Sequence, residues 1–262
     1  MVLLRSPLRL ASGLVERALG LFPKTAAACL GVVSDDGSRC RLKIGGREYS
    51  VASLDFPIPK SDFHKMLAKP GSCTIEALVD DHSAHLIVTC LEGRSTMEEA
   101  VEVASTIHLL AARLGALGDA VGGFWISSEQ LRDWGAFTRD ANTAASAVSG
   151  SGTPEFPTRY WVSVQLTQDG EAFGGATQGL RSFTGYEVEL APVSWPMSDV
   201  ADHLVGTVLY LFEAGPVLKD GETLGVSQEK RFRISIKQDE LKLRLGLEDE
   251  TAIRGSNQEE KA

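Results

Sequence analysis

The chain has 262 residues, of which 26 are Lys or Arg and 35 are Asp or Glu, so its formal net charge at pH 7 is −9. Hydrophobic residues make up 43% and charged residues 23%, a composition that excludes a disordered chain, a collagen-like repeat and a disulfide-dense miniprotein. The acidic balance argues against nucleic acid as a partner, because phosphate binding requires clustered Lys and Arg.

The first 22 residues are rich in leucine, but four charged residues interrupt them before an apolar export signal can form. No stretch approaches the ~20 apolar residues that a membrane span requires. Four cysteines, at positions 29, 40, 73 and 90, are sparse for this length and indicate reduced thiols rather than a disulfide framework. We therefore expect a cytoplasmic protein.

Residues 1–26 are predicted to contain an amphipathic helix over 7–20. Ser6-Pro7 is typical of a helix N-cap followed by proline at the first helical position, and Pro23 ends the segment. The apolar stripe would pack on the helix's own domain or on a partner chain. Because the polar side carries three arginines, a position on a membrane surface is a further alternative.

Residues 27–141 are predicted to form a first α+β half, because strand-like alternation and short glycine turns surround one strongly amphipathic helix. Strands are expected over 27–34, 39–44, 48–56, 74–79, 84–91 and 121–126, and helices over 61–67, 95–114 and from 127 or 128 to about 137.

Residues 142–158 are rich in Ala, Ser, Gly, Thr and Pro and are predicted to be a linker. A second α+β half is expected over 159–247, followed by a polar tail at 248–262. Its strands are expected over 160–166, 172–177, 186–190, 222–226, 231–236 and 241–245, and its long helix over 197–213. The fold class is therefore α+β, with mixed and antiparallel sheets packed with two long amphipathic helices. The similar order of elements in the halves leaves an internal duplication open.

Cys73, His82, His85 and Cys90 are residue types that bind zinc, but their spacing does not favour a site. No Cys-x-x-Cys pair is present, and strand alternation sends His85 and Cys90 to opposite faces. Neither a Ser nucleophile elbow nor a phosphate-binding loop is found. We expect no metal and no cofactor.

Glu187 and Glu189 lie two residues apart, so on a strand both carboxylates point to one face. Paired carboxylates can perform acid–base chemistry when burial separates their pKa values. Alternation with apolar neighbours favours a solvent-facing strand instead. Arg181 is placed to pair with either carboxylate, and an Asp220-Gly-Glu222 turn follows later in the chain.

The second half resembles the bacterial domain of unknown function family 4261. The resemblance covers roughly residues 47–236 and is carried by Gly179–Phe183, Glu187–Glu189, Asp220–Gly225 and Ser227–Lys230. The family implies no reaction, cofactor or catalytic residue. Similar small acidic α+β proteins often act as partners in toxin–immunity systems, an analogy at the level of fold.

The sequence thus predicts a non-enzymatic intracellular protein-binding module. Its most concrete form is an immunity protein that neutralises a secreted bacterial toxin through an acidic surface. The candidate binding residues are Arg181, Glu187, Glu189, Asp220 and Glu222. One alternative is a hydrolase that uses Glu187, Glu189 and Arg181 in a cleft. Another is a structural subunit that forms a homodimer through the helix at 7–20.

Overall fold

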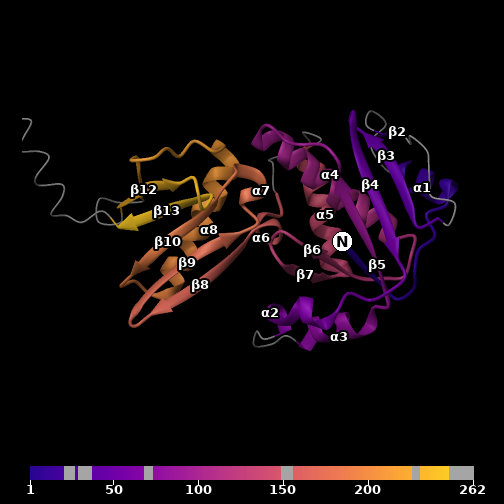
Figure 1. The fold of residues 1–262 in the computed structure, drawn as a ribbon, viewed down its shortest axis with the longest axis horizontal. Coiled ribbons are helices and arrows are strands. Elements are labelled where there is room, and N and C mark those ends of the chain that lie inside the picture. The colour runs from indigo at the N-terminus through magenta and orange to yellow at the C-terminus, as the bar shows by residue number, and fades with distance from the viewer. Residues whose placement is uncertain (21–26, 29–36, 68–72, 149–155, 226–230, 248–262) are drawn as a thin grey trace, which may run out of the picture. The chain divides into compact units, whose positions relative to one another are not determined.

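The structure is a computed structural model that describes residues 1–20, 27–28, 37–67, 73–148, 156–225 and 231–247. The chain divides into two compact units, residues 1–161 and 162–262. The α+β class with mixed and antiparallel sheets is confirmed, because each unit contains one sheet together with helices (Figure 1). Among the described residues, no helix has both the length and the apolar character needed to cross a membrane.

The first unit is built on a seven-stranded antiparallel sheet with the strand order β2-β3-β4-β5-β1-β6-β7. Its strands are β1 (Val2–Leu4), β2 (Ala27–Ala28), β3 (Arg39–Ile44), β4 (Arg47–Leu54), β5 (Ala84–Cys90), β6 (Ala120–Trp125) and β7 (Gln130–Asp133). The two-residue turn Gly45-Gly46 joins β3 to β4 with φ angles of 57° and 85°. These left-handed angles favour glycine, which explains why the hairpin was predictable.

Seven helical segments accompany this sheet within the described residues. They are α1 (Ser12–Leu19), the 3₁₀ turn η1 (Lys60–Phe63), α2 (His64–Leu67), α3 (Cys73–Asp81), α4 (Met97–Gly115), α5 (Trp134–Val148) and α6 (Thr158–Trp161). A capping box begins α4, in which Thr96 Oγ1 accepts from the amide of Glu99 and Glu99 accepts from the amide of Thr96. Helices α4 and α5 pack on each other and on the sheet.

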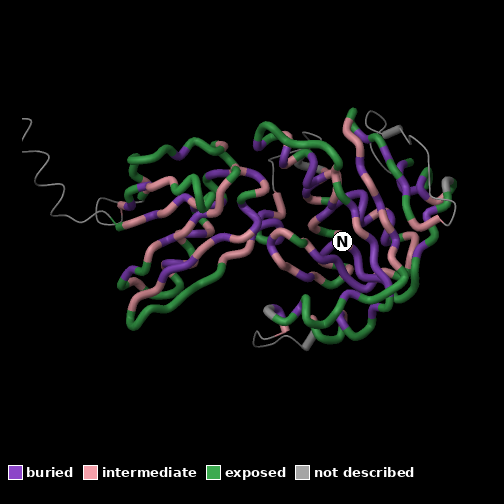
Figure 2. The backbone as a smooth tube through the Cα atoms, viewed as in Figure 1, coloured by how far each residue is buried: buried purple, intermediate pink, exposed green. Residues whose placement is uncertain are grey.

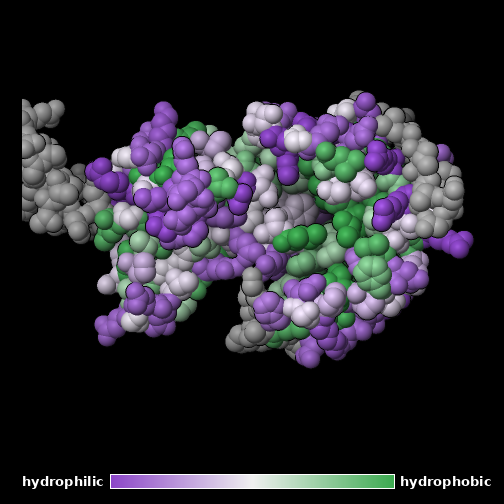
Figure 3. Space-filling model, in the orientation of Figure 1, coloured by the Kyte–Doolittle hydropathy of each residue, from purple (hydrophilic) through white to green (hydrophobic). Residues whose placement is uncertain are grey.

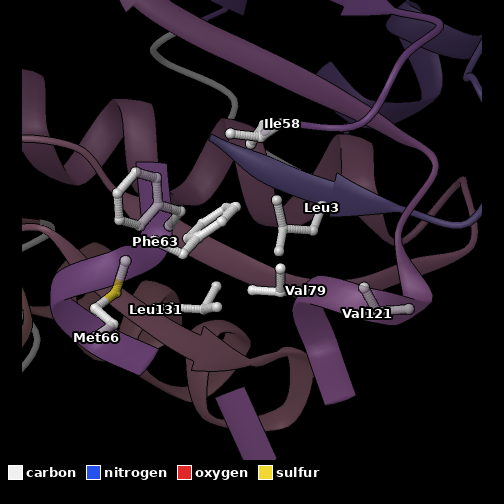
Figure 4. Close-up of a cluster of buried hydrophobic side chains, with 8 residues drawn as sticks. Leu3, Ile58, Phe63, Met66, Val79, Val121 and Leu131 are labelled. Carbon is white, nitrogen blue, oxygen red and sulfur yellow. The ribbon is translucent and has the colours of Figure 1, made fainter. Parts of the chain in front are cut away.

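A hydrophobic cluster lies between the sheet and the segment formed by η1, α2 and α3 (Figure 4). Its buried members are Leu3, Ile58, Phe63, Met66, Val79, Val121, Phe124 and Leu131. The tube coloured by burial shows the strands of this unit as mainly buried or intermediate (Figure 2). Helices therefore cover both faces of the sheet around β6 and β7, with α5 on one side and α3 on the other.

The N-terminal segment differs from the expected helix over 7–20. Residues Val2–Leu4 form a strand that pairs with β5 on one side and β6 on the other, and the helix α1 covers only Ser12–Leu19. All three residues of β1 are fully buried. An apolar triplet next to Arg5 is too short to reveal a strand from its own pattern, and its pairing partners lie 80 or more residues away.

Two further predictions in the first unit are wrong. The strand expected over 74–79 is part of helix α3, because Ile75, Leu78 and Val79 lie on one helical face against the hydrophobic cluster. The helix expected from 127 or 128 to about 137 is a turn followed by β7, and α5 begins only at Trp134. The strand expected over 27–34 includes β2, and its remaining residues lie outside the described part.

The second unit contains a six-stranded sheet with the order β11-β12-β13-β10-β9-β8. Its elements are β8 (Ser163–Asp169), β9 (Ala172–Gln178), α7 (Arg181–Thr184), β10 (Glu187–Val193), α8 (Met197–Ala214), β11 (Thr223–Gly225), β12 (Arg231–Lys237) and β13 (Lys242–Leu247). Strands β10 and β13 pair in parallel and the other neighbours are antiparallel. Helix α8 packs against β8, β9 and β10.

The two faces of this second sheet differ in character. Apolar residues that alternate along β10, β12 and β13 are buried, namely Val188, Leu190, Phe232, Ile234, Leu243 and Leu245. The His203 ring of α8 packs on Phe232 with the ring centroids 4.6 Å apart, which shows that α8 covers this apolar face. The intervening residues are polar and charged and lie on the other face.

The boundary between the units differs from the expected linker at 142–158 and the expected strand at 160–166. Helix α5 continues to Val148, and residues 149–155 lie outside the described part. Tyr160 and Trp161 belong to α6, are 1% and 0% exposed, and count with the first unit. Strand β8 then begins at Ser163. The tail at 248–262 also lies outside the described residues.

Both units place a three-stranded meander before a long helix, which agrees with the similar order seen in the sequence. The remaining strands pair differently. In the first unit the third strand of the meander, β5, has antiparallel β1 as its next neighbour, whereas in the second unit β10 has parallel β13. The complete sheets therefore do not share one topology.

Candidate functional site

Glu187 holds the turn that leads into α7. Its carboxylate accepts hydrogen bonds from three consecutive backbone amides, those of residues 179, 180 and 181, at 2.8, 3.1 and 3.2 Å. The hydroxyl of Thr177 donates a fourth at 2.7 Å. Arg181, which was expected to pair with either carboxylate, contributes its backbone amide to Glu187. Both carboxylate oxygens are thus engaged within the protein, and Glu187 has a structural role.

Glu189 has a different set of partners. Its carboxylate lies 2.8 Å from Lys242 Nζ and 3.2 Å from Arg244 Nε, both on the neighbouring strand β13. Glu240 joins the same group, 3.1 Å from Arg244 and 3.6 Å from Lys242. The hydrogen bond to Glu189 raises the pKa of Lys242. Two acids and two bases therefore form a locally neutral network on the polar face of the sheet.

The shared face that the spacing predicted for Glu187 and Glu189 does not give a catalytic pair. One carboxylate is saturated by four donors and the other faces two cations, so neither is placed to exchange a proton with a substrate. The hydrolase alternative therefore finds no support in the contacts of its three named residues.

Asp220 and Glu222 also bind backbone amides. Asp220 Oδ1 accepts from the amide of Ile236 at 2.7 Å, and Glu222 Oε2 accepts from the amide of Lys219 at 3.0 Å. The Glu222 bond closes the turn around Gly221, and the Asp220 bond, together with main-chain bonds to Ile234, attaches this turn to strand β12. Within the described part of the chain, no hydrogen bond or ion pair connects either residue to Glu187 or Glu189. The five candidate residues thus form three separate groups.

The histidines considered for zinc are held by the backbone. His82 Nε2 accepts from the amide of Ile58 at 2.9 Å, and His85 Nδ1 lies 2.9 Å from the carbonyl of Phe56. Burial lowers the pKa of His85. Among the residues that the structure describes, no group of three or more His, Cys, Asp or Glu side chains is arranged to hold a metal ion. Cys40 and Cys90 are free thiols.

Sequence reasoning missed the interior site around His108. This fully buried ring lies 4.5 Å from Phe137, 5.3 Å from Tyr160 and 5.5 Å from Trp125 between centroids. Trp161 Nε1 donates to His108 Nδ1 at 3.3 Å, and Nε2 lies 3.1 Å from the carbonyl of Phe137. The contacts fix α6 to the first unit. Because the partners come from three separate elements, β6, α5 and α6, no local motif could have revealed them.

Sequence reasoning also missed how unevenly the charge is distributed. Residues 1–161 have 16 Lys and Arg against 18 Asp and Glu, a net −2, whereas residues 162–262 have 10 against 17, a net −7. Hydrophilic side chains cover much of the visible face of the second unit (Figure 3). Helix α8 contains Asp199, Asp202 and Glu213 but neither Lys nor Arg. A charge count per unit would have revealed this asymmetry.

The outer face of α8 combines acidic and apolar side chains. Asp202, Leu209 and Glu213 follow one another at spacings of seven and four residues, so they share one helical face. Leu209 is 42% exposed and the adjacent Tyr210 is 41% exposed. We call these four residues the α8 face. On this surface Leu209 stands between two carboxylates along the helix, and Tyr210 lies beside it.

Comparison with known proteins finds a family match in this second unit. No curated protein and no solved structure matches the chain. The match is narrower than the expected range of 47–236, and it contains the Glu187 turn, the Glu189 network and α8. Residues 176–244 match the family described as Domain of unknown function (DUF4261), so this part of the second unit is similar to that family.

Proposed function

We propose that the chain is a non-enzymatic protein-binding module whose second unit engages a basic protein partner through the α8 face. The observation that carries this proposal is the charge of the second unit. Its net charge is −7, and two of its cations, Lys242 and Arg244, are already neutralised within the Glu189 network. Helix α8 contains no Lys or Arg, and its acidic residues Asp202 and Glu213 are exposed.

The α8 face suits such a partner in two physical ways. Its carboxylates attract a basic surface over roughly 10 Å of screened solution and so accelerate the encounter. Leu209 and Tyr210 then supply apolar area that a partner can bury, and tyrosine is among the residue types enriched at binding hot spots. Charge thus speeds association, and the two large side chains hold the complex.

The most concrete partner is a basic secreted bacterial toxin, which makes the chain an immunity protein of the producing cell. Both carboxylate oxygens of Glu187 already accept hydrogen bonds within the protein, which weighs against the hydrolase alternative. The homodimer through residues 7–20 is weakened as well, because Val15, Ala18 and Leu19 are buried within the first unit, where α1 packs on α4. The apolar stripe that such a dimer requires is already covered.

The test places a photocrosslinking amino acid at position 210 of the full chain in cells that produce it naturally. We expect a protein of net positive charge to be captured there. The purified partner should associate at least about tenfold more slowly with the double variant Asp202→Lys, Glu213→Lys, and more slowly at higher salt. The matched control is Glu171→Lys, Asp239→Lys, which makes the same charge change at two exposed turns away from α8.

Three results would contradict the proposal. One is the absence of a crosslinked protein, and another is capture of a partner that is itself acidic. The third is an equal loss of association rate in both double variants, because that would assign the effect to net charge rather than to the α8 face.

A further inference from the structure

The edges of the two sheets differ in how they are protected against pairing with another strand. The edge strands are β2 and β7 in the first sheet and β8 and β11 in the second. In the described part of the chain β2, β7 and β11 have two, four and three residues, whereas β8 has seven. Short edge strands are one way in which proteins prevent sheet-to-sheet association, and β8 lacks this protection.

Strand β8 also lacks the other common protective features. Its sequence, Ser-Val-Gln-Leu-Thr-Gln-Asp, contains no proline and no basic residue. It pairs with β9 through seven consecutive residues without a bulge. Residues 165–169 are all exposed. The outer side of β8 is therefore a regular, accessible row of main-chain donors and acceptors.

The hairpin geometry shows which of these groups face outward. Gly170 and Glu171 form a two-residue loop, so Asp169 and Ala172 are its closing pair and bond to each other. Amide and carbonyl groups alternate in direction along a strand. Those of Val164, Leu166 and Gln168 therefore point away from β9, toward the open edge.

One apolar side chain lies at this edge. Leu166 is 37% exposed and stands on the face covered by α8. A Cβ atom built on Gly175 would lie 3.2 Å from Leu166 and 3.0 Å from Leu204 of α8, so both leucines close over the same glycine. Leu166 thus extends the core of the second unit to the edge of the sheet, where an added strand would cover its exposed part.

We propose that β8 of a second copy of this chain pairs with β8 in antiparallel orientation, about a two-fold axis at Leu166. This register places Leu166 opposite its symmetry mate, Val164 opposite Gln168 and Gln165 opposite Thr167. About six main-chain hydrogen bonds form between the outward-facing groups, and the two second-unit sheets become one continuous sheet.

A second copy fits this edge because the strand is complementary to itself. The one charged residue, Asp169, faces Ser163 of the other strand, so no like charges stand opposite each other. The strand pair alone buries less than the roughly 1,200–2,000 Å² of stable interfaces, and two units of net charge −7 repel each other. The dimer is therefore weak, and it tightens as salt screens the repulsion.

The test is sedimentation equilibrium of the full chain from about 5 to 500 µM at low and high salt. We expect a monomer–dimer equilibrium that shifts toward dimer as salt increases. The variant Leu166→Lys places two cations opposite each other and raises the dissociation constant at least about tenfold. The matched control Thr167→Lys adds the same charge one residue away on the polar face, opposite Gln165, and changes the constant by less than about threefold.

Hydrogen exchange of the unmodified protein gives a readout that does not depend on any variant folding. The amides of Val164, Leu166 and Gln168 should exchange more slowly at 500 µM than at 5 µM, while that of Thr167 should not change. A chain that stays monomeric at every concentration overturns the proposal. So does a dimer that Leu166→Lys leaves intact, or one that both lysine variants weaken equally.

Discussion

Acidification below pH 6.5 is expected to destabilise the first unit through His108. A carbonyl only accepts a hydrogen bond and an indole N–H only donates one, so the partners Phe137 and Trp161 require the neutral ring with its proton on Nε2. Burial lowers the pKa of His108 from its usual value of 6.5 to about 3. Protonation of the buried ring would also turn its Trp161 acceptor into a donor.

The magnitude follows from proton linkage. Between pH 6.5 and pH 3 the unfolded chain binds a proton at His108 that the folded chain does not bind. The free energy of unfolding then falls by about 1.4 kcal/mol for each pH unit. Neutral His108 makes its full contribution to the free energy of unfolding above pH 6.5. The loss relative to that value is about 2 kcal/mol at pH 5 and about 3 kcal/mol at pH 4.

The assay compares urea unfolding of the unmodified chain and His108→Gln at pH 7, 5 and 4. Tryptophan fluorescence reports mainly on the first unit, which contains three of the four tryptophans. Glutamine does not titrate, yet it can donate to Phe137 and accept from Trp161. The stability advantage of the unmodified chain should therefore shrink by about 3 kcal/mol between pH 7 and pH 4. A constant difference across this range would refute the reasoning, since every other titrating group cancels in the comparison.

Two further predictions concern stability. Glu187→Ala should lower the free energy of unfolding by about 3 kcal/mol and speed amide exchange at residues 179–181 roughly hundredfold, because three amides lose their acceptor. Glu189→Ala removes only partly exposed ion pairs and should lower the free energy of unfolding by less than about 1 kcal/mol. Equal losses in the two variants would contradict the different roles assigned to the two carboxylates. Gly123→Ala should lower the free energy of unfolding in urea by about 2 kcal/mol or more, because its Cβ would lie 1.9 Å from the ring of Phe137. Gly206→Ala in α8, where a Cβ would meet nothing within 4 Å, should raise the free energy of unfolding by about 0.5–1 kcal/mol. The reverse order of stability would contradict the close contact between Gly123 and Phe137.

Long elements with regular spacing were predictable because their signals are local. Helices α4 and α8 occupy the ranges expected from their apolar spacing, and the Thr96 capping box and Gly215 mark one end of each. The segment 74–79 was not predictable in this way. Its short apolar run is compatible with a strand or a helix, and the choice depends on Val79 packing in a cluster whose other members come from distant segments.

The candidate site shows the same division between local and distant information. Alternation correctly placed Glu187 and Glu189 on one face of a strand, because that requires only a period of two. Their different roles depend on what faces them. The amides that bind Glu187 come from the turn after β9, and the cations that bind Glu189 come from β13, which pairs in parallel with β10 after about 50 intervening residues.

The central position of β1 has a consequence for how the protein is made. Val2, Leu3 and Leu4 leave the ribosome before either of their neighbours, since β5 begins at residue 84 and β6 at residue 120. Strand β5 is complete at residue 90, but β6 is complete only at residue 125, so the triplet cannot take its central place between the two before then. The first unit therefore cannot close in step with translation, and its earliest residues complete the sheet late.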